Sequence, residues 1–312
     1  VFGRITPDQK ERLVDSLKKR GYYTAMIGDG VNDVLSLKKA QIGISMQSGS
    51  AATRGVADIV LLNDSFAALP AAFMEGQRIL NGMGDIIRLF LTRAFYAAIV
   101  ILGVAVVIGV ELFPFIPKHA SLLTLLTVGF PTFGLAAWAR TGVPNKQIVR
   151  TTIRFIFPAA ITIAFTALLV YFGYLDIHYL PVEGTEAAAE ALNLARTALT
   201  TVLVFIGLLL ILFVEPPVHS LAVGDEFSGD LRPTIVAVLM LITYFAMFAV
   251  EPFREFWELS AMPLVDFIIV GATSLAWGGV QWMIWRNHMF ERFFGSPFVP
   301  ANPAENVPAE SS

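Results

Sequence analysis

From about residue 93 onward the chain consists of long apolar runs separated by short loops, and this pattern limits the possible folds more than any other feature. The chain is 55% hydrophobic and only 15% charged, which excludes an ordinary soluble domain. A run of roughly 20 apolar residues can cross the hydrocarbon core as a helix, and backbone groups there must bond within the segment. We therefore expect six transmembrane helices, at residues 94–112, 121–139, 153–175, 197–214, 233–250 and 263–285.

The distribution of Lys and Arg predicts how these helices are oriented. Basic residues concentrate in the loops on the side of the N-terminal segment, whereas the opposite loop 176–190 is acidic. The loop 215–232 is net acidic on the basic side, but acidic residues weigh little in this rule. We expect a multi-pass protein of the cytoplasmic membrane with both termini in the cytoplasm. The tail 291–312, rich in Pro and Ala, is expected to be disordered.

Residues 1–64 differ from the rest, because they alternate helix and strand signals typical of an α/β fold. A helix is expected over 8–19, with Thr6 as its N-cap and Gly21 as its stop signal. The chain has no cysteine, so thiolate metal sites and disulfides are excluded within it. The chain begins without Met, so we expect it to be part of a longer protein. The β-α repetition is too short for a full sheet, so we expect strands of a preceding segment to complete it. The further elements expected are strands 22–27, 42–46 and 59–62 and helices 34–40 and 51–57.

An acidic glycine turn, Gly28-Asp29-Gly30-Val31-Asn32-Asp33, follows the first expected strand. The carboxyl ends of parallel strands are where open α/β sheets place their chemistry. Two carboxylates would repel a phosphate, but they suit Mg²⁺, which neutralises both the acids and a phosphoryl group. A lone Gly-Asp-Gly would more simply be a surface turn with solvated acids, and Lys10 alone would be a solvated lysine.

A long amphipathic helix is expected over residues 65–93, with Asp64 as its N-cap and Pro70 in its first turns. It continues into residues 94–109, which carry no charge, and no helix breaker separates the two parts. We expect this helix to act as a stalk between the soluble segment and the membrane.

Together with the acidic turn, the motif Thr6-Pro7-Asp8-Gln9-Lys10 and the run Ala57 to Leu62 give the chain a family resemblance. It resembles the P-type (E1–E2) cation-transporting ATPases, and within them the bacterial group called ATPase E or CtpE-like, whose turn reads GDGVNDVL. The resemblance implies an α/β fold, the C-terminal half of a HAD-like Rossmannoid phosphorylation domain at 1–64. A stalk at 65–93 and an α-helical six-span domain at 94–290 follow.

In that family ATP phosphorylates an aspartate in a DKTGT motif, and this chain does not contain the motif. The resemblance therefore implies ATP-driven cation transport through an aspartyl phosphate, with ATP bound mainly by upstream domains. The isolated chain is expected to be inactive.

The resemblance also assigns roles to single residues of the turn. It implies that Lys10 contacts the aspartyl phosphate, that Asp29 is a Mg²⁺ ligand, and that Asn32 donates near the phosphoryl oxygens. Asp33 would hold the site together, and Gly28 and Gly30 would permit the tight backbone around the cofactor. Leu35 stands where most members have proline and Ile27 where many have threonine, but neither position supplies a required charge.

The cation site is implied to lie between the first two spans, where calcium-pump relatives place acids and this chain has Val128 and Tyr96. Pro131 is expected to break the second span and free carbonyl oxygens, which a bare cation needs as ligands. A hard cation is expected, with calcium among the candidates. Thr92 and Thr124 could each instead bond their own helix, and Glu111 could be interfacial. The transport-site candidates are Thr92, Tyr96, Thr124, Thr127, Gly129, Pro131, Thr132 and Glu111.

Two other functions stay open from the residues alone. A membrane-tethered HAD-type phosphatase would share the acidic turn and the lysine, although a tether needs only one span. A non-catalytic membrane module would describe the isolated chain. Nothing in the charge pattern indicates a nucleic-acid partner, and membrane lipid is the expected surrounding.

Overall fold

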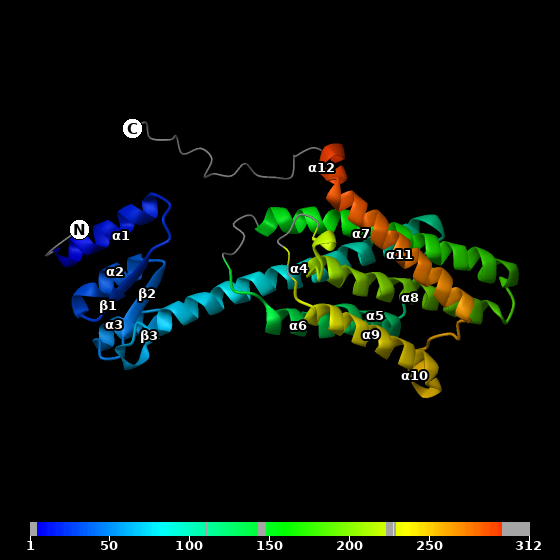
Figure 1. The fold of residues 1–312 in the computed structure, drawn as a ribbon, viewed down its shortest axis with the longest axis horizontal. Helices are drawn as coiled ribbons and strands as arrows, with labels where there is room; N and C mark the ends of the chain where they lie inside the picture. Colours follow the sequence, from blue (N-terminus) through cyan, green and yellow to red (C-terminus); the bar gives the residue numbers. More distant parts are fainter. Residues whose placement is uncertain (1–4, 110, 143–147, 223–226, 228, 295–312) are drawn as a thin grey trace. The chain divides into compact units, whose positions relative to one another are not determined.

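The computed structural model describes residues 5–109, 111–142, 148–222, 227 and 229–294 (Figure 1). Its contacts divide the chain into two compact units, Val1–Gly76 and Gln77–Ser312. The first unit is a small α/β unit and the second is helical, which confirms the fold class expected from the sequence.

The α/β unit is built around three parallel strands in the order β1-β2-β3. Gly28 pairs with Ser45, and Met46 pairs with Leu61, so the carboxyl ends of neighbouring strands lie at one edge of the sheet. The elements are α1 (Pro7–Lys19), β1 (Ala25–Gly28), a 3-10 turn (Val31–Asp33), α2 (Val34–Lys39), β2 (Ile42–Met46), α3 (Ala51–Val56) and β3 (Ile59–Leu61).

The start and end of α1 follow the local sequence signals. The Thr6 hydroxyl accepts from the Gln9 amide, and the Gln9 side chain accepts from the Thr6 amide, which forms a capping box. Gly21, just past the end, has φ +84, a backbone conformation that favours glycine. The expected N-cap and stop residue of this helix are therefore both confirmed.

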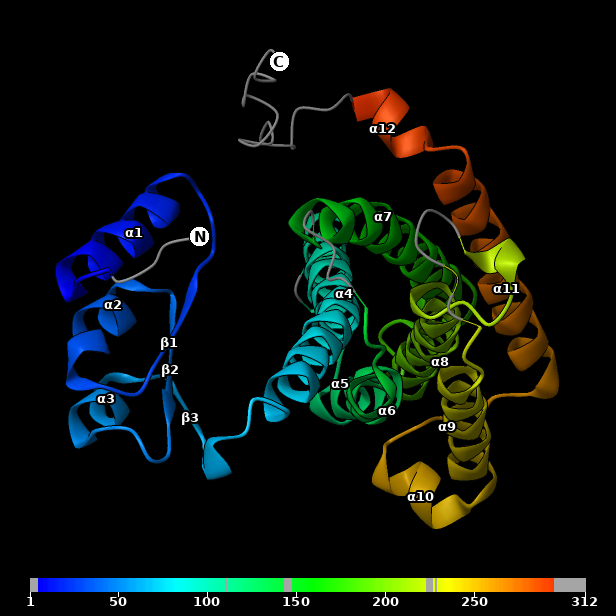
Figure 2. The same cartoon turned by 60° about the vertical axis from the view of Figure 1, so that its left-hand side comes forward.

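Helices α2 and α3 pack on the sheet, and α1 packs on α2. In Figure 2 these helices lie on one side of the strands, as right-handed crossovers between parallel strands require. Leu37, Ile44 and Leu61 form the buried core. β1 begins three residues later than expected, and Tyr22 and Tyr23, which precede it, are exposed.

Helix α4 (Ala68–Val107) runs for 40 residues without interruption through the region of Arg93, as expected. The prediction that Asp64 is the N-cap of this helix is wrong. Asp64 lies in a 3-10 turn with φ +52, and its carboxylate accepts the Ser48 amide at 3.0 Å. The carboxylate is therefore bound to the loop after β2, and the helix begins four residues later.

Among the described residues six helices are long and apolar enough to cross a membrane, which confirms the expected number. The first ends at Val107 rather than at residue 112, and residues 291–294, expected to be disordered, belong to a short helix. Residues 295–312 of the expected tail lie outside the described residues. The helices after α4 are α5 (Pro117–Thr124), a π-helical turn (Leu125–Gly129) and α6 (Phe130–Trp138), which form one span, then α7 (Ile148–Tyr174), α8 (Ala188–Val214), α9 (Arg232–Ala249), α10 (Glu251–Phe256), α11 (Leu264–Arg286) and α12 (Met289–Phe294). A π-helical turn (Leu175–Tyr179) and 3-10 turns (Leu180–Val182 and His219–Leu221) lie in the connections.

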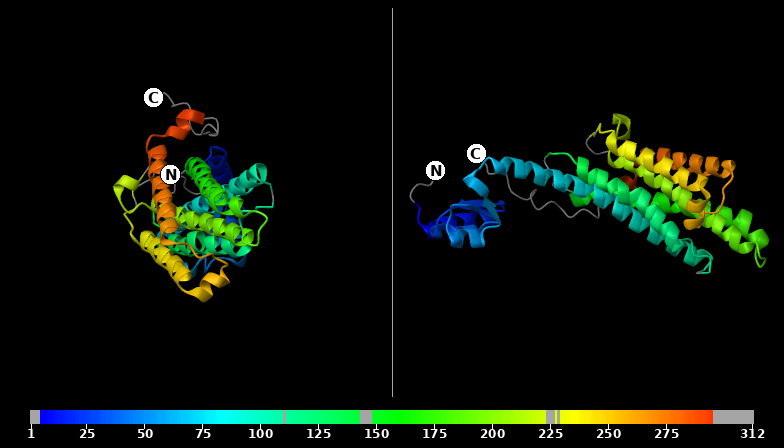
Figure 3. Two further views of the ribbon diagram at one scale, coloured as in Figure 1. Left: turned by 90° about the vertical axis from the view of Figure 1, so that its right-hand side faces the viewer. Right: turned by 90° about the horizontal axis from the view of Figure 1, so that it is seen from below.

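Helix α8 is the centre of the helical unit and packs against α7, α9, α11 and α5 (Figure 2). Its buried positions are mostly Leu, Val, Ala and Thr, and Gly207 lets another helix approach closely. A Cβ at Gly207 would lie 2.7 Å from the Thr127 side chain. Figure 3 shows α9 and α11 on one flank of this unit, with the end of α4 on the other.

Polar contacts also join the helices inside the apolar unit. The Thr162 hydroxyl on α7 donates to Gln281 Oε1 of α11 at 2.6 Å and accepts from Trp277 Nε1 at 3.0 Å. Hydrogen bonds between spans of this kind are worth about 0.6–2 kcal/mol each.

Candidate functional site

The structure joins Lys10 and Asp33, two residues that lie far apart in the sequence. Lys10 Nζ on α1 lies 2.7 Å from Asp33 Oδ1, and their side chains are 33% and 9% exposed. The second carboxylate oxygen of Asp33 accepts the Gly30 amide at 3.4 Å, and the Asp33 amide donates to the Gly30 carbonyl at 2.9 Å. A largely buried carboxylate thus ties α1 to the turn after β1 and holds the lysine ammonium beside that turn.

The two glycines of the turn have different structural requirements. A Cβ at Gly28 would lie 2.4 Å from Asp33 Cβ, so only glycine leaves room for the Asp33 side chain. At Gly30 the nearest atom would be 3.9 Å away, and its φ of −99 is open to any residue. The sequence predicted that both glycines are needed for a tight backbone. In the structure glycine is required only at position 28, because the Asp33 side chain lies so close to it.

The main chain of Asp29 is held by the neighbouring loop. Its carbonyl accepts the Ser50 amide at 2.8 Å and the Thr53 hydroxyl at 3.3 Å. A Cβ at Gly49 would lie 3.0 Å from this same carbonyl oxygen. Sequence reasoning missed Gly49, Ser50 and Thr53. The available signal was their position after β2, because the ends of adjacent parallel strands meet at one edge of the sheet.

The side chains of Asp29 and Asn32 are exposed, and within the described part of the chain neither has a hydrogen-bond partner. No group of three potential metal-binding side chains occurs among the described residues. Mg²⁺ is usually held by one or two carboxylates together with phosphate and water oxygens. An exposed, unengaged Asp29 carboxylate on a fixed backbone fits that requirement, whereas Asp33 is already bonded to Lys10.

Most of the transport-site candidates lie in α4 and in the span formed by α5 and α6. Tyr96 and Thr127 are 3% exposed and Thr92 is fully buried. The Thr124 and Thr127 hydroxyls donate to carbonyls one turn earlier, at 2.7 Å each, and for Thr124 this is what the alternative interpretation predicts. Thr92 differs, because its buried hydroxyl has no hydrogen-bond partner among the described residues.

Pro131 does not break its helix, contrary to expectation. The chain forms a π-helical turn over Leu125–Gly129 and continues as α6 through the proline. The wider turn accommodates a residue that has no amide hydrogen to donate. Thr132 then donates to the Gly129 carbonyl at 2.9 Å. The candidate oxygens near Pro131 thus lie in a widened helix rather than in an unwound one.

Glu111 is not brought together with the other candidates. It is exposed in the loop after Val107 and not within a span, because α4 ends earlier than expected. Val128 is buried in the π-helical turn. Residues 94–107 of α4 and the span formed by α5 and α6 thus offer hydroxyl and carbonyl oxygens but no carboxylate.

Arg93 is the residue of this region that sequence reasoning missed. Its guanidinium donates to the Ala120 carbonyl at 2.9 Å and to the Thr124 hydroxyl, and it lies 3.4 Å from the Tyr96 hydroxyl. Arg93 thus joins two of the expected candidates, Tyr96 on α4 and Thr124 on α5.

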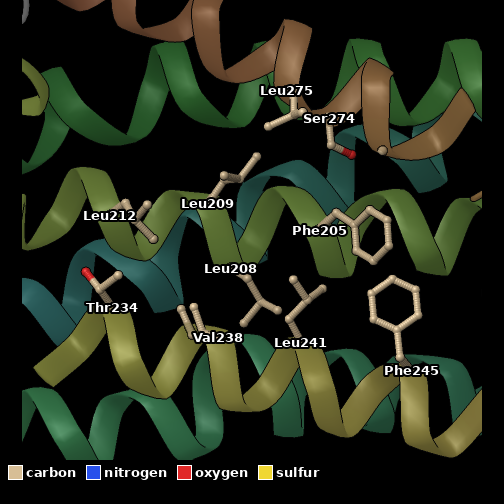
Figure 4. Close-up of a pocket in the computed structure, with 12 residues that line it drawn as sticks. Phe205, Leu208, Leu209, Leu212, Thr234, Val238, Leu241, Phe245, Ser274 and Leu275 are labelled. Atoms are coloured by element: carbon tan, nitrogen blue, oxygen red, sulfur yellow. The ribbon is translucent and has the colours of Figure 1, made fainter. Parts of the chain in front are cut away.

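A groove of about 300 Å³ between α8, α9 and α11 is a poor candidate for a cation site (Figure 4). Its labelled walls are almost entirely Leu, Val and Phe side chains, with two hydroxyl groups. Of these, the Ser274 hydroxyl donates to the Val270 carbonyl of its own helix. A bare cation needs several oxygen ligands, so this groove suits apolar groups only.

No family model matches the chain. Curated relatives include "Calcium-transporting ATPase CtpE" of Mycolicibacterium smegmatis, which is 38% identical over 201 residues, covering 62% of this chain and 25% of that protein. The protein of the same name from Mycobacterium tuberculosis is 37% identical over 208 residues, which are 64% of this chain and 26% of that protein.

A "Probable cation-transporting ATPase exp7" of Streptococcus pneumoniae is 35% identical over 176 residues, which are 54% of this chain and 23% of that protein. The chain thus spans about a quarter of the length of these relatives. The similarity agrees with the motifs of the α/β unit and with the six apolar helices. Over the part that it matches, the chain is similar to proteins named calcium- or cation-transporting ATPases.

Proposed function

We propose that this chain is the part of an ATP-driven cation pump that stabilises an aspartyl phosphate and carries six transmembrane helices. The observation that carries the proposal is the Lys10–Asp33 ion pair of 2.7 Å at the carboxyl edge of a parallel sheet, next to Asp29. The names of the relatives, which are calcium- or cation-transporting ATPases, support it.

In this proposal each residue of the turn has a distinct task. The Lys10 ammonium, oriented by Asp33, offsets the charge that develops on the oxygens of a transferring phosphoryl group. Asp29 is the carboxylate that would hold Mg²⁺, and bound Mg²⁺ supplies further neutralisation of phosphoryl charge. The exposed Asn32 amide is a donor for a phosphoryl oxygen. The nucleophilic aspartate and most of the ATP site belong to other segments of the pump.

The uninterrupted helix α4 is the proposed link between phosphorylation and transport. A single helix from Ala68 to Val107 includes Thr92 and Tyr96, two of the candidate cation ligands. Movement at its soluble end would therefore reach the candidate site without an intervening loop. We further propose that the pump lies in the cytoplasmic membrane, that both termini are cytoplasmic, and that the cargo is a hard cation such as calcium.

The test is ATP hydrolysis by the purified full-length pump, measured against a panel of cations. Asp29→Ala should abolish cation-stimulated turnover, because a Mg²⁺ ligand is lost. Asp15→Ala is the matched control, since it removes a partly exposed carboxylate on α1 that pairs with Lys19 at 2.7 Å. Normal turnover in Asp29→Ala would refute the proposed role. Hydrolysis of small phosphate esters without any cation dependence would favour a phosphatase instead.

A further inference from the structure

Arg93 on α4 is held by oxygen atoms, most of them on another helix, and not by an acid. Its guanidinium donates to the Ala120 carbonyl at 2.9 Å and to the Thr124 hydroxyl of α5, and it contacts the Tyr96 hydroxyl at 3.4 Å. Within the described residues it forms no ion pair with a carboxylate. Among these residues, the positive charge is thus stabilised by neutral oxygens alone.

The position of Arg93 along α4 makes this arrangement costly. Fourteen residues separate it from the helix end at Val107, which is roughly 21 Å at 1.5 Å per residue. The hydrocarbon core is about 30 Å thick, so this distance is shorter than the core, and Arg93 belongs to the apolar end of a helix long enough to cross a membrane. A charged group there is expensive unless it is compensated, and an intramembrane charge usually has a functional role.

The oxygens around Arg93 are of the kind that a hard cation needs. Carbonyl and hydroxyl oxygens are ligands of such cations, and here one carbonyl and two hydroxyls converge on one positive group. Thr124 also donates to the Ala120 carbonyl at 2.7 Å, which holds these two oxygens side by side. Tyr96 is almost completely buried, and Thr92, the residue before Arg93, has a buried hydroxyl without a partner.

We propose that the Arg93 guanidinium is a tethered cation that competes with the transported cation for the oxygens of Ala120 and Thr124. This inference rests on the proposed pump function, and it makes Arg93 a residue that sets cation affinity. A cation can reach these oxygens only when the guanidinium leaves them. The same charge repels a divalent ion nearby, so both effects weaken binding in the arrangement that the structure shows.

The variant that tests this is Arg93→Met, which keeps an unbranched apolar stem and removes the charge and all donors. Two charges about 6 Å apart still interact by more than 1.4 kcal/mol at an effective dielectric of about 20, so the Kd for Ca²⁺ should fall at least about tenfold. Arg93→Lys keeps the charge and should stay close to the wild-type Kd. Arg254→Met, on α10 outside the spans, is the matched control for loss of an arginine and should not change the Kd.

The second arm tests competition for a specific oxygen. Thr124→Val removes the hydroxyl that Arg93 occupies, so it should weaken Ca²⁺ binding on its own. In the double variant Arg93→Met/Thr124→Val, most of the gain from Arg93→Met should disappear, because the freed oxygen is no longer present. A gain that survives intact in the double variant would show that Arg93 does not compete for this hydroxyl, and would overturn the proposal.

The measurement is equilibrium Ca²⁺ binding to the purified full-length protein in detergent, by calorimetry and without ATP. Gel filtration and circular dichroism establish that each variant is folded. Equal Kd values for wild type and Arg93→Met, weaker binding by Arg93→Met, or no binding by either overturns the inference. The proposed function fails separately, if the wild type lacks cation-stimulated ATP hydrolysis. Asp29→Ala should stop hydrolysis and leave the binding Kd unchanged.

Discussion

Replacing Gly28 by alanine tests whether the acidic turn depends on the close approach of Asp33. The added Cβ would lie 2.4 Å from Asp33 Cβ and 2.9 Å from its Oδ2 atom. Carbon atoms in contact prefer roughly 3.5–4.0 Å, so the Asp33 side chain must move by more than about 1 Å. That movement lengthens the Lys10–Asp33 contact beyond hydrogen-bonding distance, starting from 2.7 Å.

The expected change in free energy of the Gly28→Ala variant combines two destabilising contributions and one smaller stabilising contribution. Overpacking costs about 1–3 kcal/mol, and a hydrogen bond to a charged group is worth about 1.5–3 kcal/mol, less here because Lys10 is one-third exposed. Alanine restricts the unfolded chain, which offsets about 0.4–1 kcal/mol. We expect Gly28→Ala to lower the local stability of the turn by about 2–4 kcal/mol, which is roughly a thirty- to thousandfold change in opening equilibrium.

Hydrogen exchange of the full chain, followed by mass spectrometry, measures this opening directly. The amides of Asp33 and Ser50 are the reporters, since both donate to carbonyls of the turn. Gly30→Ala is the matched control, because its Cβ would meet nothing closer than 3.9 Å, and exchange should stay within about threefold of wild type. Equal exchange in Gly28→Ala and Gly30→Ala would refute the steric argument.

Three further predictions concern other contacts. Gly207→Ala should destabilise the helical unit by about 1–3 kcal/mol, because its Cβ would lie 2.7 Å from the Thr127 side chain, and a lower thermal midpoint in detergent would show it. Thr162→Val should cost about 0.6–2 kcal/mol through its lost bond to Gln281, and a double-mutant cycle with Gln281→Leu should give a coupling of that size. The hydrogen bond from the Ser48 backbone amide, in the loop after β2, lowers the pKa of the Asp64 carboxyl group. The ionised carboxylate should therefore stabilise the fold fully above about pH 4, and this stabilisation should be lost as the pH falls through the lowered pKa. Asp64→Asn should remove this part of the acid dependence of unfolding, and an unchanged pH profile would contradict it.

The elements with strong local signals could be predicted from the sequence. Six spans follow from run length and lack of charge, because each helix satisfies its own backbone in lipid. The capping box at Thr6 and the positive φ of Gly21 depend on residues within a few positions, so α1 was placed correctly. Asp64 was misplaced because its carboxylate binds a residue 16 positions away.

The candidate site, too, could be predicted only in part from the sequence. Its residue types and their order in the acidic turn were readable in the sequence, and they indicated phosphoryl chemistry. The sequence alone did not show why Gly28 is required, or that Ser50 holds Asp29. Both facts depend on the space left by side chains that pack at the edge of the folded sheet.

The sequence by itself therefore determined which segments are long and apolar enough to cross a membrane, which segment forms the parallel α/β unit, and which residues are candidates for the chemistry. Periodicity, run length and residue type express these properties locally. Only the tertiary structure decided that Lys10 meets Asp33 across 23 residues and that Arg93 meets Thr124 across 31. Such contacts depend on how helices and strands pack together, and local sequence patterns contain no information about distances between elements that are far apart in the chain.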